Sequence, residues 1–306
     1  MSRILSVKQD HGLLRNYVDG EWLESSATRQ HPVTDPGTGK LLGQVPLSPK
    51  SEVDEAVAAA KAAFWEWRTT PPQTRARYMY KLKALLEENF EELARLNTLD
   101  HGKGIDESRG SVRRLIDNVE VAAGIPSMMM GYGLEDGAAA GIDEEVILQP
   151  LGVFTAICPY NFPAMVPFWF IPSALACGNT FVLKPSEQVP LVQNRIFELI
   201  DDELDLPPGV LNMVHGDKEA VDALLYNPDV VGVSFVGSSP VAQYIYETGA
   251  KQGKRVQAQG GAKNTIVVAD DADLDQTIPN MIASFYGCAG QRCLAGSVLM
   301  PIGDAY

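Results

Sequence analysis

The chain has 306 residues, 45% hydrophobic and 21% charged, which is ordinary for a globular protein with more than one lobe around a sizeable core. Its 39 acidic and 25 basic residues give a formal net charge of −14, which argues against a nucleic-acid or anionic-membrane surface, where Lys and Arg must dominate. The four cysteines form no disulfide framework and the four histidines are scattered, so we expect reduced thiols and no metal site.

The amino-terminal part is predicted to combine a hairpin with helices. Residues 1–12 contain neither an apolar segment nor a small-residue cleavage site, so we predict no signal peptide and a cytoplasmic protein. Asp19-Gly20 suits a tight turn at positive φ and predicts a hairpin over residues 17–25. Apolar residues at helical spacing predict helices over about 51–64, 73–98 and 105–123. Repeated glycines and Met128-Met-Met then indicate a small hairpin arm over 125–149.

The middle of the chain alternates strands and helices. The predicted strands cover residues 152–158, 180–183, 210–214 and 230–236, and the predicted helices 159–177, 192–204, 218–226 and 240–250. Such apolar strands are buried on both faces, which predicts an α/β fold with a doubly wound parallel sheet of the nucleotide-binding kind. The apolar stretch 166–183 is long enough to raise the question of a membrane span. Prolines and Gly178-Asn179 interrupt it, so we predict a buried helix and strand instead.

A second unit is predicted to begin after Gly260. It has a strand over 264–269, a helix from about residue 274 and a strand over 297–300. We therefore predict three parts: a nucleotide-binding domain (1–124 and 150–259), an oligomerisation arm (125–149) and an incomplete second α/β domain (260–306).

Two predicted strands end in residues suited to a nucleotide. Gly237-Ser238-Ser-Pro240 opens a helix whose free N–H groups would suit a phosphate, although the same pattern is typical of any well-started helix. Lys184-Pro-Ser-Glu187 places a carboxylate where it could bind both ribose hydroxyls, with the lysine assisting. Glu187 would repel a 2′-phosphate, which favours NAD over NADP. The alternative is a solvated Lys/Glu pair in a loop.

One cysteine has the setting of a nucleophile. Cys293 ends Gly290-Gln-Arg-Cys293, a glycine-rich junction after a helix, where a substrate could reach it and Arg292 or nearby N–H groups could favour its thiolate. The alternative is an inert, small apolar residue. Cys158 and Cys177 lie in apolar runs, and we interpret both as structural.

Five ordered motifs together resemble the aldehyde dehydrogenase superfamily. They are Pro159-Tyr-Asn-Phe-Pro163, Cys177-Gly-Asn-Thr180, Lys184-Pro-Ser-Glu187, Ser234-Phe-Val-Gly-Ser238 and Gly290-Gln-Arg-Cys293, and the similarity begins at Asp19-Gly-Glu-Trp22.

The resemblance implies a Rossmann-like fold and a reaction with a small aldehyde. Cys293 would form a hemithioacetal that passes hydride to NAD and leaves a thioester, while the Asn161 amide and the Cys293 N–H would stabilise the alkoxide. It also implies a set of NAD contacts: Pro159, Tyr160, Lys184, Ser186, Glu187, Phe235, Gly237 and Ser238.

The residue at position 259 departs from the hydrolytic members of the superfamily. Gln259-Gly-Gly-Ala-Lys263 stands where those members carry Glu-Leu-Gly-Gly-Lys, and an amide is not a useful base near neutral pH. Gly261-Ala-Lys-Asn264 instead resembles the CoA-acylating methylmalonate-semialdehyde dehydrogenases, although that branch has Asn at position 259 and usually Phe at position 160. In that branch coenzyme A takes the acyl group, which loses CO2 to give propionyl-CoA or acetyl-CoA.

The resemblance to this branch also implies that two arginines hold the carboxylate of the substrate. Arg292 precedes the nucleophile, and Arg114 lies in Gly110-Ser-Val-Arg-Arg114 on the third predicted helix. The alternative for Arg113 and Arg114 is a solvated helix face.

Two other functions stay open, a hydrolytic aldehyde dehydrogenase that uses another base and an inactive fragment that only binds. Superfamily members continue well past the nucleophile, so we expect this chain to be truncated. The whole protein is expected to be a homodimer or homotetramer.

Overall fold

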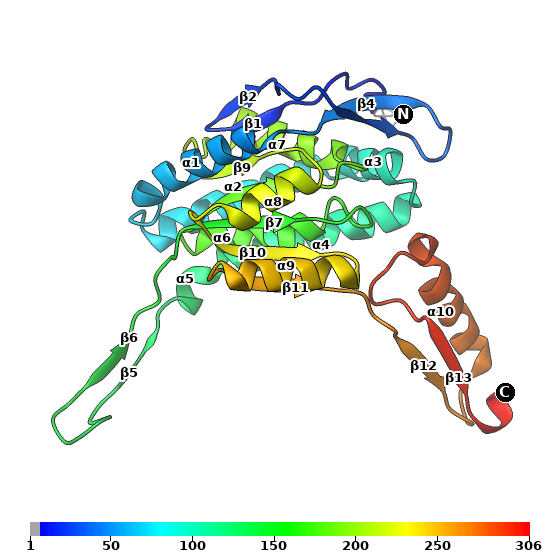
Figure 1. The fold of residues 1–306 in the computed structure, drawn as a ribbon. Helices are drawn as coiled ribbons and strands as arrows, with labels where there is room; N and C mark the ends of the chain where they lie inside the picture. The colour runs from blue at the N-terminus through cyan, green and yellow to red at the C-terminus, as the bar shows by residue number, and fades with distance from the viewer. Residues whose placement is uncertain (1–6) are drawn as a thin grey trace.

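The computed structural model describes residues 7–306. Residues 1–6, part of the stretch for which we predict no signal peptide, lie outside the described residues. The body is built on one seven-stranded sheet (Figure 1), whose central strands are mostly buried. In spatial order its strands are β11 (Arg255–Gln259), β10 (Val230–Val236), β7 (Val153–Ile157), β8 (Thr180–Lys184), β9 (Leu211–Met213), β1 (Asn16–Val18) and β2 (Glu21–Leu23).

The strand order reverses in the middle of the sheet. The chain runs outward from β7 through β8 to β9, and then returns to the other side of β7 to form β10 and β11. These five strands are parallel, whereas β1 and β2 form an antiparallel hairpin at the edge. The predicted doubly wound α/β sheet is thereby confirmed, with its switch point between β7 and β10.

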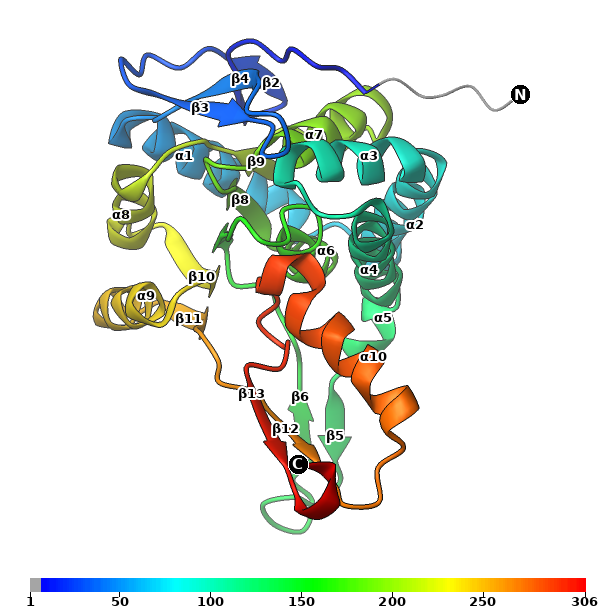
Figure 2. The same cartoon turned by 90° about the vertical axis from the view of Figure 1, so that its right-hand side faces the viewer.

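Helices cover both faces of the sheet (Figure 2). One layer consists of α1 (Lys50–Trp67), α8 (Lys218–Tyr226) and α9 (Ser239–Lys251). The other consists of α2 (Pro72–Glu88), α3 (Phe90–His101), α4 (Ile105–Ala123), α6 (Ile171–Ala176) and α7 (Leu191–Glu203). Every residue of β8 is buried, with Phe181 and Leu183 packing into the core beneath the second layer and Val182 into the core beneath the first. Alternate side chains of one strand thus join the two layers.

Two extensions project from the body in different directions (Figure 1). One is a hairpin arm that follows the short helix α5 (Ile125–Met128) and contains β5 (Tyr132–Leu134) and β6 (Glu144–Val146). The other is the carboxy-terminal unit, with β12 (Thr265–Val268), α10 (Leu274–Tyr286), η2 (Gly287–Gly290), β13 (Val298–Pro301) and η3 (Gly303–Ala305). These extensions match the predicted arm and second unit in position, and the division into three domains stays a prediction.

Some elements differ from the predictions. The single helix predicted over 73–98 is two helices, because Asn89 interrupts the ladder and its amide donates to the Leu85 carbonyl. The stretch 159–177 is not one helix: residues 159–165 form a loop, and the 3₁₀ turn η1 (Val166–Trp169) and the short helix α6 follow it. The hairpin of β3 (Gln30–Thr34) and β4 (Leu41–Pro46) was not predicted. Within residues 7–306 no helix has the length and apolarity to cross a bilayer.

Candidate active site

The carboxyl ends of four parallel strands meet at one edge of the sheet. In the strand register, Ile157 at the end of β7 lies opposite Lys184 of β8 and Phe235 of β10, and Val236 lies opposite Gln259 of β11. The loops that follow these strands contain the predicted nucleotide contacts. Because ligands of open α/β sheets bind outside the carboxyl ends at the switch point, this edge is the candidate cofactor site.

The Lys184–Glu187 pair connects the last residue of β8 with the loop that follows this strand. The Lys184 side chain is buried and its Nζ donates to Glu187 Oε2 over 2.7 Å, whereas the Glu187 side chain is 28% exposed. The Lys184 carbonyl accepts from the Cys158 N–H. Ser186 is buried and its hydroxyl accepts the Gln188 N–H. A solvated pair is therefore excluded for Lys184, and Glu187 is the member of the pair that reaches solvent.

The turn from β10 into α9 leaves a helix start open. Ser238 occupies the N-cap position in extended conformation but makes no side-chain capping bond, so the first N–H groups of α9 stay available to an anion. A Cβ on Gly237 would lie 2.4 Å from the ring of Phe235, so a larger residue there would force the ring or the turn to shift. The Phe235 side chain is itself buried. Its ring packs against Gly237 of the turn and is not exposed to a ligand.

The loop after β7 exposes one aromatic ring. Pro159 is half-buried and Tyr160 is exposed at the carboxyl edge. The Cys158 thiol beneath them is buried, which raises its pKa and keeps it protonated. The interpretation of Cys158 as structural agrees with this burial.

Cys293 opens onto a cavity of about 780 Å³ between α4, the loop after β7 and α10. Apolar side chains of Phe162, Met165 and Trp169 line one part, and the predicted Arg114 and Arg292 line another. Cys293 is half-buried, and its carbonyl accepts from the Asn264 amide over 2.7 Å. The structure thus brings the predicted nucleophile and both predicted arginines to one cavity.

Asn161 lies against the segment that carries the nucleophile, residues 287–293, which we term the nucleophile loop. Its Nδ2 donates to the Gln291 carbonyl over 2.6 Å, and its buried Oδ1 has no partner among the described residues. An NH₂ group has two donors, so one stays free after this contact. The Asn161 backbone carbonyl accepts from Lys103 Nζ over 2.5 Å and lies 3.8 Å from the Cys288 sulfur.

The arginines differ in their partners. Arg113 forms a bidentate pair with Glu87 and its guanidinium lies 4.9 Å from the centre of the Phe90 ring, on the outer face of α4. Arg114 donates to the Gly110 carbonyl, and no carboxylate of the described chain lies within ion-pair distance of it. Arg292 donates to Glu107 over 2.5 Å. Arg114 is therefore the free cation of the cavity.

Lys103 and Glu107 are site residues that the sequence analysis missed. Lys103 is buried, which lowers its pKa, and its Nζ lies 4.0 Å from the centre of the Phe162 ring. Glu107 lies in the first turn of α4, where an acidic side chain is favoured by the helix dipole. Its position in the sequence therefore does not indicate a role in the site. The sequence offered one sign that Lys103 belongs to the site, which is its position between two glycines in Gly102-Lys103-Gly104.

Gln259 lies on the cofactor side of the site. Its carbonyl accepts the Gly237 N–H over 3.0 Å, its side chain is half-buried, and it does not line the cavity at Cys293. Its amide could not act as a base from any position.

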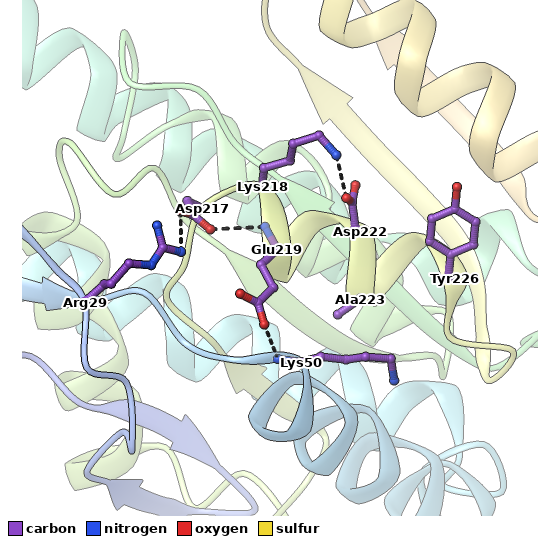
Figure 3. Close-up of a pocket in the computed structure, with 8 residues that line it drawn as sticks. All are labelled: Arg29, Lys50, Asp217, Lys218, Glu219, Asp222, Ala223 and Tyr226. Atoms are coloured by element: carbon purple, nitrogen blue, oxygen red, sulfur yellow. Dashed lines mark hydrogen bonds and ion pairs between the residues drawn. The ribbon is translucent and has the colours of Figure 1, made fainter.

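Another cavity, of about 490 Å³, lies along α8, beside Arg29 and the start of α1 (Figure 3). Its charges are paired within it, Arg29 with Asp217 and Lys218 with Asp222, and the Lys50 N–H donates to Glu219. We therefore assign it no chemistry. Across the described part of the chain, no three His, Cys, Asp or Glu side chains are grouped to hold a metal ion.

Comparisons with known proteins agree on one family. Residues 22–301 match the model of the aldehyde dehydrogenase family. Malonate-semialdehyde dehydrogenase 2 of Geobacillus thermodenitrificans is 52% identical over 291 residues, which cover 95% of this chain and 60% of the relative. The chain therefore spans about 60% of the length of the curated relatives it matches.

Two solved structures bear on the cofactor. One is of a Sinorhizobium meliloti protein assigned as a methylmalonate-semialdehyde dehydrogenase, in complex with NAD, with 45% identity and a TM-score of 0.91 over 95% of this chain and 59% of that one. The other is an NADP-dependent enzyme of Escherichia coli, with 35% identity and a TM-score of 0.90 over 94% of this chain and 60% of that one.

Proposed function

This chain belongs to the aldehyde dehydrogenase family, and from that premise we propose that the whole protein oxidises a small semialdehyde with NAD through a thioester on Cys293. The observation that carries the proposal is the cavity at Cys293, with Asn161 held against the nucleophile loop and Arg114 and Arg292 in the wall. The names of the relatives support a semialdehyde that carries a carboxylate.

Oxidation begins with attack of the Cys293 thiolate on the aldehyde carbon, which forms a hemithioacetal alkoxide. The free N–H of the Asn161 amide and the Cys293 backbone N–H stabilise that oxygen, because their dipoles are already oriented by the fold. NAD, when bound, accepts the hydride that leaves the carbon. The products are NADH and an acyl group joined to the Cys293 sulfur.

The residues at the carboxyl edge of the sheet fit NAD. Glu187 presents a half-exposed carboxylate to a ribose, and the N–H groups at the start of α9, beside Gly237 and Ser238, suit the pyrophosphate. Glu187 would also repel a 2′-phosphate, which favours NAD over NADP for this chain.

Release of the acyl group uses coenzyme A. The side chain at position 259 is an amide that cannot take a proton from water, so hydrolysis has no base there. The thiol of coenzyme A attacks the thioester instead and frees Cys293. The carboxylate that Arg114 and Arg292 hold leaves as CO2, and the electrons of the broken C–C bond pass into a thioester enolate. The α-carbon then takes a proton from water, and the products are acetyl-CoA or propionyl-CoA.

The test follows NADH with the whole protein, malonate or methylmalonate semialdehyde and NAD, with and without coenzyme A. We expect a burst of one NADH per site without coenzyme A and sustained turnover, with an acyl-CoA product, when it is present. Cys293→Ala should remove both the burst and the turnover. Steady formation of free acid without coenzyme A would place the protein among hydrolytic dehydrogenases, and absence of any Cys293-dependent oxidation would overturn the proposal.

A further inference from the structure

A single carboxylate oxygen holds both ends of the nucleophile loop. Glu107 Oε1 accepts the Cys288 backbone N–H over 2.7 Å and a guanidinium N–H of Arg292 over 2.5 Å. We propose that Glu107 is a positioning residue that fixes the nucleophile loop and controls how strongly Arg292 binds an anionic substrate. This inference rests on the proposed function.

The loop needs such support because its backbone is strained. Cys288 and Ala289 both have φ near 53°, and Gly290 follows at 74°, so three consecutive residues adopt the left-handed conformation. Two of the three carry a Cβ, which makes this conformation unfavourable without contacts from outside the loop. The bond from the Cys288 N–H to Glu107 is such a contact, made at the first strained residue.

Arg292 closes the loop from its other end. A Cβ on Gly287 would lie 2.6 Å from its Nη2, so the guanidinium lies directly against the backbone of Gly287. Glu107 binds the same nitrogen, which brings residues 287, 288 and 292 to one point, with Cys293 next in the chain. Loss of the carboxylate therefore frees the segment that carries the nucleophile.

Glu107 is well placed to act as an anchor. It extends from the first turn of α4, a helix whose inner face is buried in the core, and the nucleophile loop approaches this helix (Figure 2). Arg114 lies two turns further along α4 and faces the same cavity. One helix thus supplies a free cation, and also the carboxylate that partly neutralises Arg292.

This arrangement has a consequence for substrate choice. The carboxylate of an anionic aldehyde competes with Glu107 for the Arg292 guanidinium, whereas a neutral aldehyde forms no ion pair with it. Glutamine at position 107 can still accept the Cys288 N–H but no longer neutralises Arg292. Alanine loses both contacts.

The experiment compares Glu107→Gln and Glu107→Ala in the whole protein, with malonate semialdehyde and propanal as anionic and neutral substrates. We expect Glu107→Ala to lower kcat with both substrates about 100-fold, the scale of a nucleophile displaced by an ångström. Glu107→Gln should recover most of that kcat. It should also lower KM for malonate semialdehyde about fivefold without a comparable change for propanal, because one partly exposed ion pair is lost.

The matched control is Glu120→Gln, which removes one negative charge from the same helix at an exposed pair with Lys83, remote from the loop. An effect of Glu120→Gln equal to that of Glu107→Gln would attribute the change in KM to net charge and overturn the inference. So would a kcat of Glu107→Ala within threefold of the parent. If the parent itself oxidises neither aldehyde, the proposed function falls, and this result is distinct from an active parent with unaffected variants.

Discussion

Asn161 serves the site through two groups that mutation can separate. Its backbone carbonyl holds Lys103 and contacts the Cys288 sulfur, whereas its side-chain amide donates to the Gln291 carbonyl and keeps one N–H for the alkoxide. Asn161→Ala removes the amide alone. We therefore expect kcat to fall about 10²–10³-fold, the usual effect of losing one oxyanion donor.

NADH formation by the whole protein measures this effect, and the rate of Cys293 alkylation by iodoacetamide serves as the control for an intact loop. A kcat within threefold of the parent, with alkylation unchanged, would exclude the Asn161 amide from the oxyanion site.

His215 makes the stability of the fold depend on pH. Burial is the main cause that lowers the pKa of this histidine to about 3, and the nearby Lys184 ammonium adds to it. Neither ring nitrogen has a partner among the described residues. Between pH 6.5 and 3 the unfolded chain therefore binds a proton at this residue that the folded chain does not, so stability is lost as the pH falls through this range.

His215→Leu should reduce this loss. Between pH 6.5 and 5 the free energy of unfolding of the parent should fall by about 2 kcal/mol more than that of the variant. Urea denaturation at several pH values measures the difference. His101, whose pKa is also lowered, to about 4, titrates in both proteins and cancels in the comparison. Parallel pH curves for the two proteins would contradict the prediction.

At the scale of elements, the turn between β10 and α9 depends on one glycine. Gly237→Ala would place a Cβ 2.4 Å from the buried Phe235 ring, so the ring or the turn must shift. We expect a loss of about 1–3 kcal/mol of stability, as for other overpacked sites. KM for NAD should rise as well, because the start of α9 is displaced from the pyrophosphate.

Thermal unfolding and NADH kinetics test this turn, and the double variant Gly237→Ala/Phe235→Leu should recover part of both properties. Gly104→Ala is the control, since nothing lies within 4 Å of its added Cβ. If Gly237→Ala left KM for NAD unchanged, the turn would have no part in binding the cofactor.

The elements that could be predicted are those with a strong apolar pattern of their own. β8, buried at every position, and α4, with a regular apolar stripe, were both predicted. β11 has the sequence Arg-Val-Gln-Ala-Gln and is nowhere fully buried, so only its pairing with β10 makes it a strand. Asn89 ended a helix that periodicity alone would continue.

The residues of the candidate site also separate into those that the sequence could predict and those that it could not. The ordered motifs pointed to Cys293, Asn161 and Lys184, because each motif is local in sequence. Glu107 was missed since its partners, Cys288 and Arg292, lie more than 180 residues away and one sequence contains no sign of such contacts. The resemblance had singled out Arg114, and the orientation of α4 adds that Arg114 lines the cavity whereas Arg113 pairs with Glu87.

At the scale of the whole molecule, the nucleophile depends on polar contacts between distant parts of the chain. The carboxy-terminal unit contributes Cys293, while the body supplies Asn161 and Glu107 as partners for the nucleophile loop. α10 has no fully buried residue, so this unit gains little order from apolar packing in the described chain. The position of Cys293 relative to the cofactor edge therefore rests largely on the contacts from α4 and from the loop after β7.

The arm is the other extension of the molecule, and its surface predicts self-association. Tyr132 and Ile147 are 73% and 68% exposed on a hairpin whose strands have only three residues each. A two-stranded hairpin is marginal by itself in water, and exposed apolar side chains on it favour contact with another surface. The homodimer or homotetramer stays a prediction, and we expect a second copy to cover the arm in it.

A double substitution on the arm tests that prediction. Tyr132→Asp/Ile147→Asp in the whole protein would place two charges in the contact, and burying an unpaired charge is costly. We expect light scattering after size exclusion to give a smaller assembly than the parent. Tyr80→Asp is the control, because Tyr80 is 61% exposed on α2 and remote from the arm. An unchanged mass for the double variant would mean that the arm does not hold the assembly together, since a surface that buries Tyr132 and Ile147 could not accept both carboxylates.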